Sequence, residues 1–154
     1  MVNPPLIYRQ KLSKILNEVG VHLSRLEEAI EELNKHYQFP LTEKQFKALV
    51  DERADLAYAD QLIYRFSKAQ DTIGAKLFKA FLQYQGENVD RPFLDILTAL
   101  EKLNLVDVDE WFLLREIRNQ IAHNYEDDLN QARQILNKIE QGSVTLKAIY
   151  KKII

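Results

Sequence analysis

The sequence predicts an all-α fold, an antiparallel up-and-down bundle of four to five main helices that forms a single domain over residues 1–154. Apolar residues recur at helical spacing along almost the whole chain. Glycine and proline occur four times each, which leaves few positions where a long helix must break. No segment alternates polar and apolar residues as a half-buried strand does. Short connections between long helices favour antiparallel neighbours, and 154 residues suffice for one core but hardly for two.

The first predicted helix carries a narrow apolar seam. The Phe39-Pro40 pair ends this helix, because proline cannot continue one. The apolar residues follow one another at steps of four and three, the spacing that keeps a stripe facing one partner helix. We expect this stripe to pack inside the bundle rather than in a separate coiled coil. The seam residues are Leu12, Leu16, Val19, Leu23, Leu26, Ile30, Leu33 and Tyr37.

A second helical stretch is predicted between Thr42 and Gly86. Thr42 and Gln45 have the spacing of a capping box, and Gly86 suits a helix end because glycine adopts left-handed conformations readily. Gly74, inside the stripe, indicates either a close approach of two helices or a weak point. The later half of the stretch repeats the seam at Ala59, Ile63, Phe66, Gln70, Ile73, Leu77, Ala80 and Tyr84.

Acidic residues mark the starts of the next two helices. Asp90 is a suitable cap for a third helix, with Pro92 tolerated in its first turn. Asp107, three residues before Glu110, predicts the start of a fourth helix that runs from about residue 108 to near His123. The buried side of the third helix is predicted to consist of Phe93, Ile96, Leu97 and Leu100.

A fifth helix is predicted to begin at Asp127 or Asp128. The Gly142-Ser143 pair is expected to break it, and a short amphipathic helix then closes the chain. The inward residues are predicted to be Leu129, Ala132, Ile135, Leu136 and Ile139 before the break, and Leu146, Ile149, Tyr150 and Ile153 after it.

Composition excludes several classes of protein. The chain has no cysteine, so disulfides, thiolate metal sites and a cysteine nucleophile are excluded. No stretch approaches the roughly 18 consecutive apolar residues that span a bilayer, and the N-terminus lacks the apolar core of a signal peptide. We therefore expect a cytoplasmic protein. The net charge of −2 argues against non-specific coating of nucleic acid, although it leaves room for a local basic site.

The segment Trp111–Tyr125, WFLLREIRNQIAHNY, carries the most informative pattern. Leu113, Leu114, Ile117 and Ile121 fall on one side of a helical wheel and predict an ordinary core stripe. Aromatic and polar residues share the opposite side, which is unusual for a solvated face. A mixed face suits a second packing surface, such as a homodimer interface that encloses a polar site. The opposite side contains Trp111, Phe112, Arg115, Arg118, Asn119, Ala122 and His123.

The spacing of Arg118 and His123 raises a geometric question. The two residues are five apart, which places them about 140° apart around a helix axis, whereas Asn119 and His123 share one face. One straight helix would not direct both Arg118 and His123 at one small ligand. Either the helix ends just before His123, or a twofold axis brings Arg and His together from two chains. We favour the twofold axis.

These residues resemble the motif of a known family. Arg118, four further residues, His123, one residue and Tyr125 resemble the Arg–His–Tyr signature of HEPN-domain toxins of the HepT type, and Asn119 directly after the arginine also fits. The stretch DQLIYRFSKAQDTIGAKLF, the turn at Gly86, the proline-led third helix and the EKLNLV connection are similar as well. The resemblance covers roughly the last two-thirds of the chain and implies a HEPN-like bundle.

The resemblance also implies an activity and a partner. HepT-like toxins are homodimers, or higher oligomers, whose paired motifs form a ribonuclease cleft. Their usual partner is a minimal nucleotidyltransferase antitoxin, which transfers AMP to the motif tyrosine, here Tyr125. AMP at that position would add negative charge and bulk beside His123 and so block RNA. Transfer RNA is one kind of target in the family.

A cofactor-free mechanism suits the motif. RNA supplies its own nucleophile, the 2′-hydroxyl, so cleavage requires a proton acceptor, a proton donor and positive charge on the phosphate. His123 titrates in the appropriate pH range, and Arg118 offers a permanently charged fork. Asn119 would orient the phosphate or the imidazole, and Tyr125 would donate a hydrogen bond or stack on a base. No carboxylate–histidine cluster has clear metal-ligand spacing.

Ordinary structural roles remain open for the same residues. Arg118 would serve equally well in a surface ion pair, and Tyr125 as an aromatic wedge between the fourth and fifth helices. His22 and His36 have no evident partners in the sequence. Two lysine-rich groups fit either RNA phosphates or a solvated face. The alternative function is a catalytically inactive HEPN-like protein that docks to a nucleotidyltransferase and presents a substrate. The lysine-rich groups are Lys147, Lys151 and Lys152, and Arg65, Lys68, Lys76 and Lys79.

Overall fold

The computed structural model describes residues 5–122 and 128–154 of the chain. Within these residues all regular secondary structure is helical, so the predicted all-α class is confirmed. No helix in the described ranges has the length and apolar character needed to cross a membrane. The elements are α1 (Leu6–Asn34), α2 (Glu43–Asp51), α3 (Arg53–Thr72), the π-helical turn η1 (Ile73–Leu77), α4 (Phe78–Tyr84), α5 (Phe93–Lys102), α6 (Val108–Ala122) and α7 (Leu129–Ile153).

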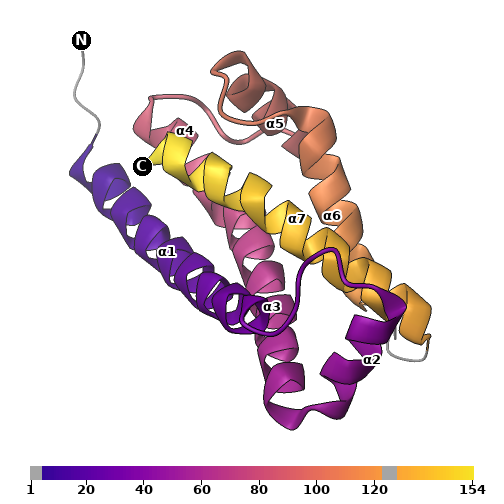
Figure 1. Cartoon of the computed structure of the whole chain (residues 1–154). Coiled ribbons are helices and arrows are strands. Elements are labelled where there is room, and N and C mark those ends of the chain that lie inside the picture. The colour runs from indigo at the N-terminus through magenta and orange to yellow at the C-terminus, as the bar shows by residue number, and fades with distance from the viewer. Residues whose placement is uncertain (1–4, 123–127) are drawn as a thin grey trace.

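The helix α1 packs antiparallel to the continuous rod formed by α3, η1 and α4 (Figure 1). Near one end the Lys11 ammonium donates a 3.2 Å hydrogen bond to the Gln83 side chain, and near the other the Gln61 amide donates to the carbonyl of Arg25 at 2.8 Å. The apolar seam predicted for the first helix is confirmed for six of its eight residues, whereas Leu16 and Tyr37 are only half-buried, and Tyr37 lies beyond the end of α1. Ile15 and Ala29 join the buried stripe, which consists of Leu12, Ile15, Val19, Leu23, Leu26, Ala29, Ile30 and Leu33.

The helices α6 and α7 complete the antiparallel bundle. α7 packs against α1, α3 and α6, and in Figure 1 it crosses the molecule between them. The Tyr150 hydroxyl donates to the carbonyl of Leu16 at 3.1 Å, and the Lys147 ammonium pairs with Glu27. The residue numbers rise from Lys147 to Tyr150 along α7, whereas those of their partners fall from Glu27 to Leu16 along α1. The two helices are therefore antiparallel.

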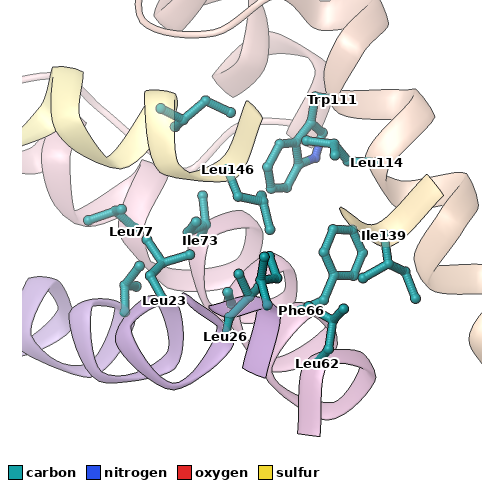
Figure 2. Close-up of a cluster of buried hydrophobic side chains, with 14 of the residues drawn as sticks. Leu23, Leu26, Leu62, Phe66, Ile73, Leu77, Trp111, Leu114, Ile139 and Leu146 are labelled. Atoms are coloured by element: carbon teal, nitrogen blue, oxygen red, sulfur yellow. The ribbon is translucent and has the colours of Figure 1, made fainter. Parts of the chain in front are cut away.

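Side chains from all four long segments meet in one core (Figure 2). Phe66 of α3 lies at its centre. Trp111 of α6 packs edge-on against Phe78, with ring centroids 4.8 Å apart. Burial of this apolar surface is the main force that stabilises the bundle. Labelled members of the core are Leu23, Leu26, Leu62, Phe66, Ile73, Leu77, Trp111, Leu114, Ile139 and Leu146.

Three of the four predicted helix starts are confirmed. Thr42 and Gln45 form the capping box, with reciprocal bonds of 3.2 and 3.1 Å. Asp107 accepts from the backbone of Glu110, and Asp128 is the residue that caps α7. The third start differs, since the cap position of α5 belongs to Pro92, two residues after the predicted Asp90.

The second predicted stretch is divided where the sequence has neither glycine nor proline. Glu52 adopts an extended conformation, with φ −102° and ψ 114°, and separates α2 from α3. Phe46 and Leu49 are buried on α2, whereas Ala59 and Leu62 are buried on α3. α2 contacts α3 and α7, whereas α3 also packs against α1 and α6, so each half buries its apolar residues against a different set of helices. This tertiary packing overrides the local propensity for one helix.

The predicted break at Gly142-Ser143 was wrong, because α7 continues through both residues. A Cβ atom on Gly142 would lie 3.0 Å from Leu114 and 3.2 Å from Phe66, so glycine allows α6 and α3 to approach α7 closely. The Ser143 hydroxyl is buried and donates to the carbonyl of Ile139 at 2.7 Å. Small residues here serve helix packing rather than helix termination.

Candidate active site

The buried side of α6 overlaps the predicted one but is shifted toward Trp111: Leu114 is buried and Ile117 and Ile121 pack against the core as predicted, whereas Leu113 does not. Trp111 and Leu114 are 1% and 3% exposed, whereas Leu113, predicted as core, is 66% exposed. Ile117 and Ile121 are only half-buried. The helix is therefore rotated so that the indole points inward. Gly74 makes this possible, because a Cβ atom at that position would lie 2.8 Å from the Trp111 ring.

The outward side of α6 retains a mixed face. Phe112 is 42% exposed, and Arg115 and Asn119, three and seven residues later, are exposed on the same stripe. These residues belong to the predicted second packing surface, which loses Trp111 to the core. The predicted homodimer across this face remains a prediction.

Arg118 lies in the last described turn of α6 and pairs with a carboxylate on α3. Its Nε donates to the two Asp71 oxygens at 3.1 and 3.3 Å, and its Nη2 donates to one of them at 3.2 Å. The two side chains are 31% and 47% exposed. The bonds hold the guanidinium by one edge, so Nη1 is the nitrogen free of bonds to the described residues.

Sequence reasoning missed Asp71 because it lies 47 residues before Arg118. A detectable signal does exist, because Asp71 and Gly74 are three apart on one helix face, and glycine inside an apolar stripe indicates a close helix contact. The helix that packs there is α6, which brings its arginine to the same place.

The other predicted site residues are only partly placed. Asn119 is exposed, next to Arg118. His123 and Tyr125 lie outside the described residues. The choice between a helix end before His123 and a twofold axis therefore stays open.

Asp71 also lines a pocket of about 400 Å³ between α3, η1, α5 and α6. The guanidinium of Arg115 lies over the Phe93 ring at this pocket, 5.5 Å from the ring centroid. Arg118 and the pocket thus share one carboxylate. The lining residues are Gln70, Asp71, Gly74, Ala75, Phe93, Trp111 and Arg115.

The two other histidines have partners that the sequence did not reveal. His22 Nδ1 lies 3.0 Å from Arg65 Nη1, and burial, followed by the Arg65 charge, lowers the pKa of His22. The lowered pKa favours the neutral imidazole, which is the form able to accept a hydrogen bond from the arginine. His36 Nδ1 lies 3.3 Å from buried Asp55. Both histidines therefore have local structural roles.

Asp55 also accepts a 2.6 Å hydrogen bond from the Tyr37 hydroxyl. Burial, and then this bond, raise the pKa of Tyr37 from 10.0 to about 12. Because the folded value is the higher one, the phenol's contribution to stability is complete below pH 10 and is lost as the pH rises through about 12.

We expect Tyr37 to stay neutral in the folded protein at pH values where ordinary tyrosines ionise. The difference between the tyrosinate absorbance titrations of the wild type and of Tyr37→Phe measures this, at pH values where circular dichroism shows folded protein. Asp55→Asn should lower the pKa of Tyr37. A difference curve with its step at the ordinary pKa would contradict the expectation.

Several basic side chains already have acidic partners. Lys147 pairs with Glu27, and Lys76 lies 3.7 Å from Glu18. Lys151 and Lys152 are exposed at the end of α7. No group of three or more histidine and acidic residues suited to a metal ion occurs within residues 5–122 and 128–154.

Comparisons with models of protein families, with curated proteins and with solved structures found no match to this chain.

Proposed function

We propose that the chain is a cytoplasmic toxin of a toxin–antitoxin system, an endoribonuclease that cleaves RNA through Arg118 and His123 without a metal ion. The observation that carries the proposal is the position of Arg118. It is partly exposed near the end of α6, next to Asn119 and directly ahead of the His–Tyr part of the motif, with its guanidinium fixed by Asp71. The Arg–His–Tyr motif supplies the likeness to HEPN toxins.

The proposed reaction is an internal transfer at phosphorus. His123 of one subunit removes the proton from a 2′-hydroxyl, whose oxygen attacks the adjacent phosphorus. The bond from phosphorus to the 5′-oxygen breaks, and the second subunit's imidazolium gives that oxygen a proton. The products are a 2′,3′-cyclic phosphate and a free 5′-hydroxyl.

Arg118 stabilises the charge that builds on the phosphate oxygens. Asp71 occupies the Nε edge of the guanidinium, so the remaining edge meets the phosphate in a fixed orientation. Fixed orientation matters because a preorganised charge loses nothing to reorientation during the reaction.

The exposed stripe of Phe112, Arg115 and Asn119 supports a homodimer across α6. A twofold axis there places two copies of the motif along one groove. The site would then take one arginine and one histidine from each of two chains.

The proposed partner is a nucleotidyltransferase antitoxin that transfers AMP to Tyr125. The added phosphate would repel RNA beside His123 and occupy the space of the substrate. Co-expression with such a partner should add the mass of one or more AMP units at Tyr125, and Tyr125→Phe should prevent it.

One experiment tests the activity. Purified, unmodified protein is incubated with total RNA, and separately with transfer RNA, in the presence of a chelator, beside His123→Ala. Cleavage by the wild type alone, with 2′,3′-cyclic phosphate ends, is expected. Cleavage that the chelator stops, or that His123→Ala retains, would refute the mechanism.

The Arg118–Asp71 ion pair also favours the alternative function, an inactive docking partner of a nucleotidyltransferase. Asp71 neutralises Arg118 within one subunit, as an arginine with a purely structural role would require. Absence of cleavage, together with a stable complex between this chain and a nucleotidyltransferase, would favour this function.

A further inference from the structure

The pocket that Asp71 lines has the features of a ligand site. Its volume is about 400 Å³, within the range of small-molecule sites. Its walls combine two aromatic side chains, Phe93 and Trp111, with three polar ones, Gln70, Asp71 and Arg115. Such a mixture suits a flat ligand with polar edges better than an aliphatic one.

One wall contains a buried donor without a partner. The Nε1–H of Trp111 makes no hydrogen bond to the described residues, although the side chain is only 1% exposed. The indole packs on Gly74, a lining residue: a Cβ atom there would lie 2.8 Å from Cζ2 and 3.7 Å from both Cε2 and Cη2. Trp111 itself lines the pocket, so an unpaired donor belongs to a residue of the pocket wall. An unsatisfied buried donor is costly, and a ligand acceptor would remove that cost.

The backbone at the pocket is also irregular. Gly74 and Ala75 belong to the π-helical turn η1, and such turns often occur at functional sites. Any side chain at Gly74 would collide with the indole, whereas Ala75 is small and exposed at the pocket. The small residues keep the space open.

The lining chemistry matches a nucleobase. Phe93 already stacks with the Arg115 guanidinium, and a base can stack on either group. Trp111 offers a donor to a ring nitrogen, and Asp71 an acceptor for an exocyclic amine. Gln70, which is 5% exposed, offers the paired donor and acceptor that suit an adenine edge. The pocket is less suited to a free anion, because the Asp71 carboxylate in its wall would repel one.

We infer that this pocket binds a purine base. Since Asp71 also holds Arg118, the base would belong to a nucleotide beside the scissile phosphate, and this part of the inference rests on the proposed ribonuclease function. Binding of the base gives the enzyme a preference for purines at that position.

The chain has a single tryptophan, so its fluorescence reports on this pocket alone. Emission of Trp111 is followed, with excitation at the red edge of the indole band, while AMP, GMP, UMP or ribose 5-phosphate is added. Ala75→Leu fills the pocket from an exposed position, and Ala57→Leu is its matched control, an exposed alanine on α3 that does not line the pocket. Thermal unfolding checks that both variants fold.

We expect a saturable change with AMP or GMP, weakened about tenfold or more by Ala75→Leu and within about twofold of wild type in Ala57→Leu. No saturable change, equal binding by Ala75→Leu, or equal binding of UMP or ribose 5-phosphate would overturn the inference. The fluorescence titration and the RNA cleavage assay test the two proposals independently. RNA cleavage without a nucleotide response would refute the pocket alone, and a nucleotide response without cleavage would refute the ribonuclease alone.

Discussion

Replacing Arg118 with alanine is expected to slow RNA cleavage by about 10²- to 10³-fold, the usual cost of losing one preorganised donor to a transition-state oxygen. The side chain is partly exposed and lies at the end of a helix, so the fold should tolerate the change. Single-turnover cleavage of a short RNA at saturating protein measures the chemical step without the contribution of binding.

Arg118→Lys should recover little of the lost rate. Arginine donates to Asp71 from one edge and keeps another edge for the phosphate, whereas an ammonium cannot make both planar contacts. Asp71→Asn keeps the size of the partner but removes its charge, and we expect a smaller loss, about tenfold, from poorer orientation.

Arg25→Ala is the matched control. Arg25 also pairs with a carboxylate, Glu28 at 3.1 Å, but this pair lies on α1 and is exposed. Its removal should leave the cleavage rate unchanged. Full activity of Arg118→Ala, or an equal loss from Arg25→Ala, would show that Arg118 has no part in the chemistry.

Local patterns explain why much of the fold was predictable. The α1 seam, the Thr42 capping box and the Asp128 cap each depend on residues within one or two helical turns of one another. Such spacings do not depend on the tertiary arrangement, so they can be recognised from the sequence alone. The break at Glu52 could not, because only packing against other helices separates α2 from α3.

The geometry of the candidate site, by contrast, could not be predicted from local patterns. α6 has apolar residues on both sides, so its periodicity did not determine which side is buried. Gly74 determines it, by making room for Trp111, and Gly74 is distant in sequence. The pairing of Arg118 with Asp71 follows from the same contact between helices. Long-range contacts of this kind become predictable only when the partner helix is known.

Trp111→Ala is therefore expected to be among the most damaging single changes to stability. The side chain is the largest of those that are fully buried, and it contacts both Phe78 and Gly74. Truncation of a buried tryptophan to alanine costs about 3–5 kcal/mol, a large part of the roughly 5–15 kcal/mol that holds a domain folded. Urea unfolding followed by far-ultraviolet circular dichroism measures the loss without needing the tryptophan signal.

Phe112→Ala provides the matched control, because the neighbouring aromatic residue is 42% exposed. Its truncation should change the free energy of unfolding of one subunit by about 0.5 kcal/mol or less, as at most surface positions. Since Phe112 lies on the proposed dimer face, unfolding is measured at two protein concentrations, which separates association from the stability of the subunit. Equal losses from the two variants at low concentration would contradict the rotation of α6 that brings Trp111 into the core and Arg118 to Asp71.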